Sequence, residues 1–264
     1  MKREMSVNGS FYPDAKVELH RYFEHFNKHL EEQNISTDAK QSRVVIVPHA
    51  GYVYSGYSAN LAYKVLANSK IKNIVVIGPS HRVAFSGVSL CNFESYKTPL
   101  GDIHGSDLAQ KLRDKFSLTC FDGAHKEHST EVQFPFIKHY LDEVKIVELV
   151  YSQVDARFLS KIIDFVLEDE NCGVIISTDL SHFYNQKEAN SLDAICLDAI
   201  KNLDIDKLHS GCEACGITGV QAMMISAKKL SLDFSLLDYR TSADASGDSS
   251  RVVGYMSGYF NEKV

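Results

Sequence analysis

The stretch RVVIVPH at residues 43–49 joins an apolar run to a histidine, and the chain repeats this pattern twice. Residues 73–81 read NIVVIGPSH, and residues 173–182 read GVIISTDLSH. Short Val/Ile runs bounded by Pro, Gly and Ser are typical of buried strands in an α/β sheet. Ligands bind beyond the carboxyl ends of strands in such sheets. We therefore expect one site for a metal ion or for proton transfer, formed where the three terminal side chains meet: His49, His81 and His182.

The rest of the chain alternates between helical and strand patterns. Helices are predicted at 15–32, 58–67, 106–116, 134–141, 155–167, 187–203 and 219–230, and further strands at 87–91, 145–151, 234–239 and 251–260. This alternation predicts an α/β sandwich with a mostly parallel or mixed central sheet. Because no linker, repeat or low-complexity segment interrupts the pattern, a single domain is predicted over residues 1–264.

Bulk composition narrows the class of protein. The chain has 264 residues, of which 44% are hydrophobic and 23% charged, with a formal net charge of -6. This balance gives no electrostatic support for binding nucleic acid or an anionic membrane. No apolar stretch approaches the roughly 18 residues of a membrane span, and no apolar segment follows the basic start as in a secretory signal. The sequence thus predicts a soluble, cytoplasmic protein.

The six cysteines are scattered, apart from Cys212 and Cys215, which form a C-x-x-C pair. Scattered cysteines in a cytoplasmic protein are typically buried thiols. The single C-x-x-C pair lacks both the second pair of a structural zinc site and the strand context of a thioredoxin motif. We therefore expect buried thiols rather than a redox or metal site.

Two further segments carry polar side chains suited to chemistry. Asp179 precedes His182 by three residues, and a carboxylate beside an imidazole can orient the ring or raise its basicity. Residues 127–131 read EHSTE and place His128 and Glu131 near a predicted helix start. In both segments the alternative is structural, because such side chains also cap helices, and a lone histidine can sit in a turn with its hydrogen bonds satisfied.

The types of the predicted ligands do not determine which metal ion binds. Two imidazoles and one carboxylate form the facial triad of non-haem Fe(II) oxygen chemistry, and the same set with a bound water suits hydrolysis by Zn²⁺. The late loop at 241–248 offers Asp244 and Asp248 as the carboxylate. The phosphate-binding motifs G-x-G-x-x-G and G-x-x-x-x-G-K-[ST] and the nucleophile motif G-x-S-x-G are all absent.

These segments together resemble the Memo family, whose prokaryotic members are called protein B of the AmmeMemoRadiSam system. The resemblance spans nearly the whole chain. It is carried by GSFYP at 9–13, PHAGYVYSG at 48–56, GPSH at 78–81, TPLG at 98–101, EHSTE at 127–131, STDLSH at 177–182, CG at 215–216 and DSSRVVGY at 248–255.

The family is similar in fold to class III extradiol dioxygenases, so the resemblance implies an αβα sandwich with a metal pocket. It implies that His49 and His81 are metal ligands, and that His182 is the acid/base histidine with Asp179 beside it. Eukaryotic members supply a cysteine from the late loop, and the dioxygenases supply a glutamate. This loop has neither, so Asp244 becomes the expected third ligand and Asp248 the second choice. A carboxylate favours Fe(II), Mn(II) or Zn(II) over copper.

Three functions remain open from the sequence. The first is a non-haem Fe(II) dioxygenase-like oxidoreductase acting on a small molecule. His182, Asp179 and His128 would be its catalytic residues, and Tyr52, Tyr54 and Glu131 would line its substrate pocket. The second is a metal- or peptide-binding protein without turnover that works with a radical-SAM partner. The third is a metal-dependent hydrolase. The expected cofactor is a divalent metal, Fe(II) first, with Zn or Cu as alternatives.

Overall fold

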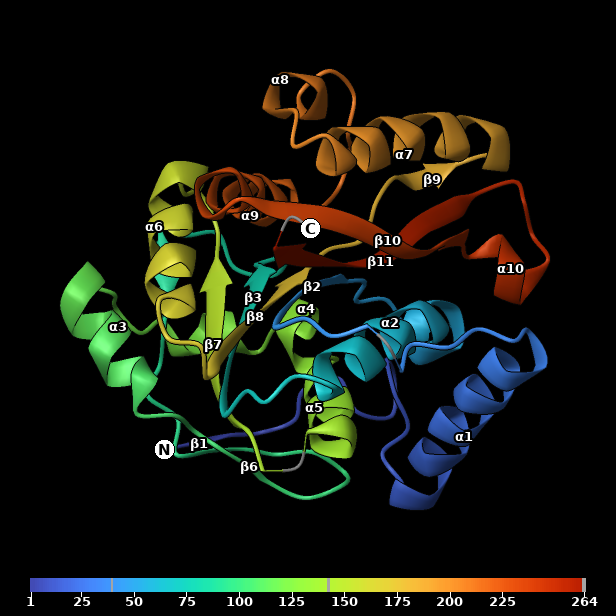
Figure 1. The fold of residues 1–264 in the computed structure, drawn as a ribbon. Helices are drawn as coiled ribbons and strands as arrows, with labels where there is room; N and C mark the ends of the chain where they lie inside the picture. Colours follow the sequence, from blue (N-terminus) through green and yellow to red (C-terminus); the bar gives the residue numbers. More distant parts are fainter. Residues whose placement is uncertain (39, 142, 263–264) are drawn as a thin grey trace.

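A computed structural model describes residues 1–38, 40–141 and 143–262 of the chain. In the described part, a mixed eight-stranded sheet forms the centre of the fold (Figure 1). Its strands in spatial order are β10 (Leu232–Thr241), β11 (Val252–Glu262), β2 (Val44–Val47), β8 (Cys172–Ser177), β3 (Asn73–Pro79), β7 (Lys145–Tyr151) and β4 (Val88–Ser89), and β9 (His182–Tyr184) pairs with β11. The four inner strands β2, β8, β3 and β7 are parallel, whereas β4, β9, β10 and β11 pair antiparallel.

The inner strands are apolar on both faces because both faces are covered. Along β2, Val44 and Ile46 pack into one hydrophobic core, while Val45 and Val47 pack into another. Successive strand side chains point to opposite faces of a sheet, so an uninterrupted Val/Ile run is the pattern that a sheet with two cores requires.

Helices form a layer on each side of the sheet (Figure 1). One core is covered by α3 (Leu108–Phe116), α6 (Ala156–Leu167), α7 (Gln186–Lys201), α8 (Ile205–Leu208) and α9 (Ile217–Leu230). The other is covered by α1 (Lys16–Glu32), α2 (Tyr52–Ala67) and α5 (Phe134–Tyr140). The short elements are η1 (Asp122–His125), α4 (His128–Glu131), α10 (Ala243–Ser246) and a small sheet of β1 (Lys2–Arg3), β5 (Ser95–Tyr96) and β6 (Ile103–His104).

The α/β class and the mixed sheet are confirmed, and most predicted elements are present with shifted ends. The helix predicted at 58–67 begins at Tyr52, directly after the loop that carries His49. The backbone N–H of Tyr52 donates to the carbonyl of Phe11 at 2.8 Å, a long-range contact that sequence periodicity does not reveal. The two-residue strands of the small sheet are too short to leave a hydrophobic period.

Four of the six cysteines are paired, which corrects the expectation of buried thiols. Disulfides join Cys91 to Cys120 and Cys196 to Cys212, and Cys172 and Cys215 are free. The paired residues are 29 and 16 positions apart in the sequence, and folding brings their Cα atoms to within 4.6 and 4.8 Å of each other.

Among the described residues, no helix is both long and apolar enough to cross a membrane.

Gly78, near the end of β3, lets α4 approach the sheet closely. A Cβ at this position would lie 2.5 Å from Ser129 Oγ and 2.8 Å from Thr130 Cγ2. Ser129 Oγ is itself held, because it donates to the carbonyl of Pro79 at 2.7 Å. Gly78→Ala is therefore expected to lower the free energy of unfolding by about 1–3 kcal/mol through overpacking.

Chemical denaturation of the Gly78→Ala variant checks this prediction. Gly123→Ala is the matched control, since a Cβ there would meet nothing within 4 Å. Equal stability of the two variants would show that α4 can move away from β3 without cost.

Candidate metal centre

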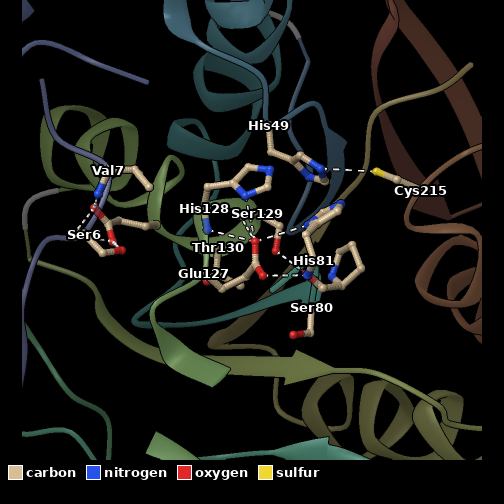
Figure 2. Close-up of polar contacts among 12 residues, drawn as sticks. Ser6, Val7, His49, Ser80, His81, Glu127, His128, Ser129, Thr130 and Cys215 are labelled. Carbon is tan, nitrogen blue, oxygen red and sulfur yellow. Dashed lines mark hydrogen bonds and ion pairs between the residues drawn. The ribbon is translucent and has the colours of Figure 1, made fainter. Parts of the chain in front are cut away.

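The parallel strands β2, β3 and β8 end at the same edge of the sheet, and the segments after them carry the candidate side chains. His49 follows β2, His81 follows β3, and Asp179 follows β8. His128 comes from α4, and Cys215 comes from the loop before α9 (Figure 2). The centroids of the imidazole rings of His49, His81 and His128 lie 4.6–5.4 Å apart. The predicted meeting of His49 and His81 is therefore present in the fold.

His49 is almost fully buried, and its ring is oriented by Ser177 at the end of β8. His49 Nδ1 lies 2.9 Å from Ser177 Oγ. That hydroxyl donates its own hydrogen to the carbonyl of Ser129 at 2.5 Å and accepts from Gln133 Nε2 at 3.0 Å. With the hydroxyl hydrogen engaged, His49 Nδ1 is the donor, so Nε2 keeps its lone pair. Burial, with the neighbouring His128 and His81, lowers the pKa of His49 well below its ordinary value, so the ring is neutral.

Glu127 is fully buried at the start of α4 and orients the other two imidazoles. Its Oε1 lies 3.2 Å from His81 Nδ1 and 2.8 Å from His128 Nδ1. Its Oε2 accepts from the backbone N–H of His81 at 2.6 Å, and Oε1 also accepts from the N–H groups of His128 and Ser129 (Figure 2). A carboxylate that receives Nδ1–H leaves Nε2 free to bind a metal.

The charge of Glu127 is stabilised despite its burial. Burial alone would raise the pKa of Glu127, but the hydrogen bonds from His128 and His81 hold that pKa far below its ordinary value. Glu127 is therefore negatively charged at neutral pH, and it supplies a fixed negative charge next to the histidines.

Cys215 supplies a sulfur donor on the other side of His49. Cys215 Sγ lies 3.2 Å from His49 Nε2 and accepts from the backbone N–H of Asp179 at 3.3 Å. Burial and the nearby Asp179 raise the pKa of the Cys215 thiol to about 12. His49, His81 and Cys215 form one group of donor atoms within 4.8 Å of one another, and His81, Glu127 and His128 form a second.

The predicted third ligand lies elsewhere. Asp244 belongs to neither donor group, and its Oδ2 accepts from the backbone N–H of Thr241 at 2.8 Å on the approach to α10. Asp248 is exposed and holds Ser250 within its own loop. The structure thus replaces Asp244 with Cys215 as the third candidate donor. Cys215 belongs to the Cys-Gly motif at 215–216, which was the available signal, but its C-x-x-C pair with Cys212 was interpreted as buried thiols without a metal role.

Asp179 and His182 lie beside the donors. Asp179 Oδ1 accepts from the backbone N–H of His49 at 2.7 Å, and Oδ2 is 4.0 Å from His49 Nε2. Burial raises the pKa of Asp179. His182, which was expected to meet His49 and His81, is half-buried on β9, pairs with Val253 of β11 and belongs to neither donor group.

The residues predicted to line a substrate pocket have other partners. Glu131 is buried and accepts from the backbone N–H groups of Ser6 and Val7, each at 2.8 Å, so it anchors the amino-terminal segment. The Tyr52 hydroxyl is buried and donates to the carbonyl of Val132. Tyr54 is exposed and lines a separate cavity of about 680 Å³ with Asp244.

Comparison with known proteins gives one consistent family. A family model described as Memo-like protein matches residues 3–259. A MEMO1 family protein of Methanobrevibacter smithii is 35% identical over 98% of this chain and 100% of its own length. A MEMO1 family protein of Thermoplasma acidophilum is 33% identical over 97% of this chain and 98% of its own length. One of Aquifex aeolicus is 31% identical, with 98% of each chain covered.

Proposed function

This chain belongs to the Memo-like protein family, and we propose that it binds a transition-metal ion through His49, His81 and Cys215 for an oxidoreductase reaction on a small molecule. One observation carries the proposal: these three donor atoms, from segments far apart in the sequence, lie within 4.8 Å of one another. Three protein donors leave a coordination position open, which is the arrangement of catalytic rather than structural metal sites.

The donor chemistry fits a transition metal. Nδ1 of His49 is held by Ser177, and Nδ1 of His81 by Glu127, so each ring offers its Nε2 lone pair. Imidazole and thiolate suit Zn²⁺, Fe²⁺ and copper, whereas Mg²⁺ and Ca²⁺ require oxygen ligands. The thiol in place of the expected carboxylate makes the site softer, which strengthens the alternatives of zinc and copper beside Fe²⁺.

The residues around the donors suit acid–base chemistry. As Fe(II), the bound metal would supply Lewis acidity and redox chemistry with O2. Imidazoles can take up and release protons at neutral pH, so His182 and His128 would move protons to and from a bound substrate. Asp179 positions His49 through its backbone N–H. This set, on a sheet with a helical layer on each face, supports likeness to class III extradiol dioxygenases, and catechols are the first substrates to test.

Metal content of anaerobically purified protein tests the proposal. About one Fe or Zn per chain is expected in the wild type, and none in the His49→Ala/His81→Ala double variant. O2 uptake by Fe(II)-loaded protein with a panel of catechols then tests the oxidoreductase step. A wild type that takes up no Fe(II), Zn(II) or Cu(I) would overturn the metal site. Bound Fe(II) without O2 uptake would overturn only the oxidoreductase part.

Metal affinity is expected to rise with pH. The pKa of the Cys215 thiol is raised to about 12, so the metal-free thiol is protonated at neutral pH and must lose its proton to bind. His49, with its lowered pKa, is already neutral and releases none. The apparent association constant for Zn²⁺ should therefore increase about tenfold per pH unit between about pH 7 and 8. Calorimetric titration in buffers of different protonation enthalpy measures the released proton, and a constant affinity would contradict thiolate binding.

A further inference from the structure

The loop that carries Cys215 is joined covalently to a neighbouring helix. Cys212 forms a disulfide with Cys196 of α7, and only two residues separate Cys212 from Cys215. Cys196 is fully buried in the core beneath α7, and Cys212 is 8% exposed. The disulfide therefore connects the donor loop to a fixed point of the fold.

Other contacts hold this segment on both sides of Cys215. On its amino-terminal side, the hydroxyl of Tyr184 donates to Glu213 Oε1 at 2.9 Å, and Ala214 is buried. The backbone N–H of Cys215 donates to the carbonyl of Asp179 at 3.2 Å. The N–H of Gly216 donates to Thr178 Oγ1 at 2.9 Å. On the amino-terminal side, the segment between α8 and Cys215 contains Gly211 at a φ of 136°, a conformation that favours glycine. The disulfide adds a covalent restraint to these contacts on the amino-terminal side of Cys215.

We propose that the Cys196–Cys212 disulfide is a redox-sensitive clamp that positions Cys215, so that its reduction weakens metal binding at the His49–His81–Cys215 site. The inference rests on the proposed function, because it assigns a regulator to that same site. The sequence predicts a cytoplasmic protein, and disulfides in a reducing compartment are typically catalytic or redox-sensing. The second disulfide, Cys91–Cys120, lies beyond β4 at the opposite edge of the sheet from α7 and provides an internal comparison.

The redox step is a two-electron reduction by a dithiol. A thiolate of the dithiol attacks Cys212 Sγ, the more exposed sulfur, and the S–S bond breaks with Cys196 leaving as a thiolate that takes up a proton. The second thiol of the reductant then displaces Cys212. Two electrons pass to the protein, Cys196 and Cys212 end as thiols, and the dithiol ends as a cyclic disulfide.

Loss of the clamp should weaken binding without abolishing it. The hydrogen bonds of Cys215 and Gly216 remain. Cys215 Sγ therefore still occupies its position beside His49 and His81, but for a smaller fraction of the time. Because opening this ring, whose two cysteines lie 16 positions apart, returns conformational freedom to the loop, we expect about a tenfold rise in the Zn²⁺ dissociation constant. Zn²⁺ is the suitable probe because it does not itself oxidise thiols.

The experiment compares two double variants of the full chain, Cys196→Ala/Cys212→Ala and Cys91→Ala/Cys120→Ala. Each loses one disulfide, so both lose folding stability, but only the first releases the donor loop. The first readout is the Zn²⁺ dissociation constant from competition with a chromophoric chelator. The second needs no metal: the rate at which iodoacetamide alkylates Cys215, read by peptide mass spectrometry, should rise about tenfold only in the first variant as the loop opens.

Each outcome decides one proposal. A tenfold loss of Zn²⁺ affinity in Cys196→Ala/Cys212→Ala and in dithiol-reduced wild type, with Cys91→Ala/Cys120→Ala unchanged, supports the clamp. Equal affinities and equal alkylation rates in all forms overturn the clamp and leave the metal site standing. Absence of Zn²⁺, Fe(II) and Cu(I) binding from every form overturns the proposed function, while the alkylation rates still test the clamp. Peptide mapping that finds Cys196 and Cys212 as free thiols in unreduced protein also overturns the clamp.

Discussion

Cys215→Ser is expected to weaken Zn²⁺ binding at least a hundredfold. Serine keeps the size of the side chain but its hydroxyl stays protonated, so the site loses its anionic sulfur donor. The two imidazoles remain, oriented by Ser177 and Glu127, and two neutral nitrogen ligands hold zinc far more weakly than two nitrogens and a thiolate. Equilibrium dialysis against a zinc buffer measures the change.

Two control variants make this prediction specific. Cys172→Ser alters the other free cysteine, which lies at the opposite end of β8 from the site, and should leave affinity unchanged. Asp244→Ala removes the carboxylate that the sequence indicated and should also leave affinity unchanged. A large loss of affinity in Asp244→Ala, with Cys215→Ser unaffected, would reverse the assignment of the third ligand.

Glu127→Gln is expected to reduce metal affinity about 10–100-fold, because groups that orient metal ligands have effects of this size. The amide can accept at one atom only, whereas the carboxylate receives the Nδ1 groups of His81 and His128 and three backbone N–H groups. Buried donors without acceptors cost about 1–3 kcal/mol each, so the free energy of unfolding should also fall by about 3 kcal/mol.

Glu131→Gln separates these two effects. Glu131 is a buried carboxylate four residues further along, and it receives donors from the amino-terminal segment rather than from the site histidines. This variant should lose stability to a similar degree and retain its metal affinity. If both variants lose affinity equally, general destabilisation of α4 and not the loss of histidine orientation is the cause.

The sequence was sufficient where local pattern and general topology determine the result. Continuous Val/Ile runs predict strands buried on both faces, and parallel strands place their ends at one edge. From these two facts His49 and His81 could be expected to meet, and their side chains do. Sequence reasoning placed Asp179 beside His182, whereas in the fold its Oδ1 accepts from the backbone N–H of His49.

Sequence reasoning failed where the deciding contact is long-range or depends on burial. Cys215 reaches His49 across 166 positions, through a loop whose course no period encodes. Glu127 and Glu131 both belong to one short polar segment, yet one orients the histidines and the other anchors Ser6 and Val7. Only the packing of α4 against β3 and the amino-terminal segment distinguishes these two carboxylates.

The spread of the donors along the chain also fixes when the site can form during synthesis. His49 and His81 leave the ribosome early, whereas Cys215 follows after β2, β3 and β8 are all available to pair. A nascent chain shorter than 215 residues offers only two of the three donors. Acquisition of the proposed metal is therefore expected to be a late event, which follows translation of most of the protein and does not template the folding of its first half.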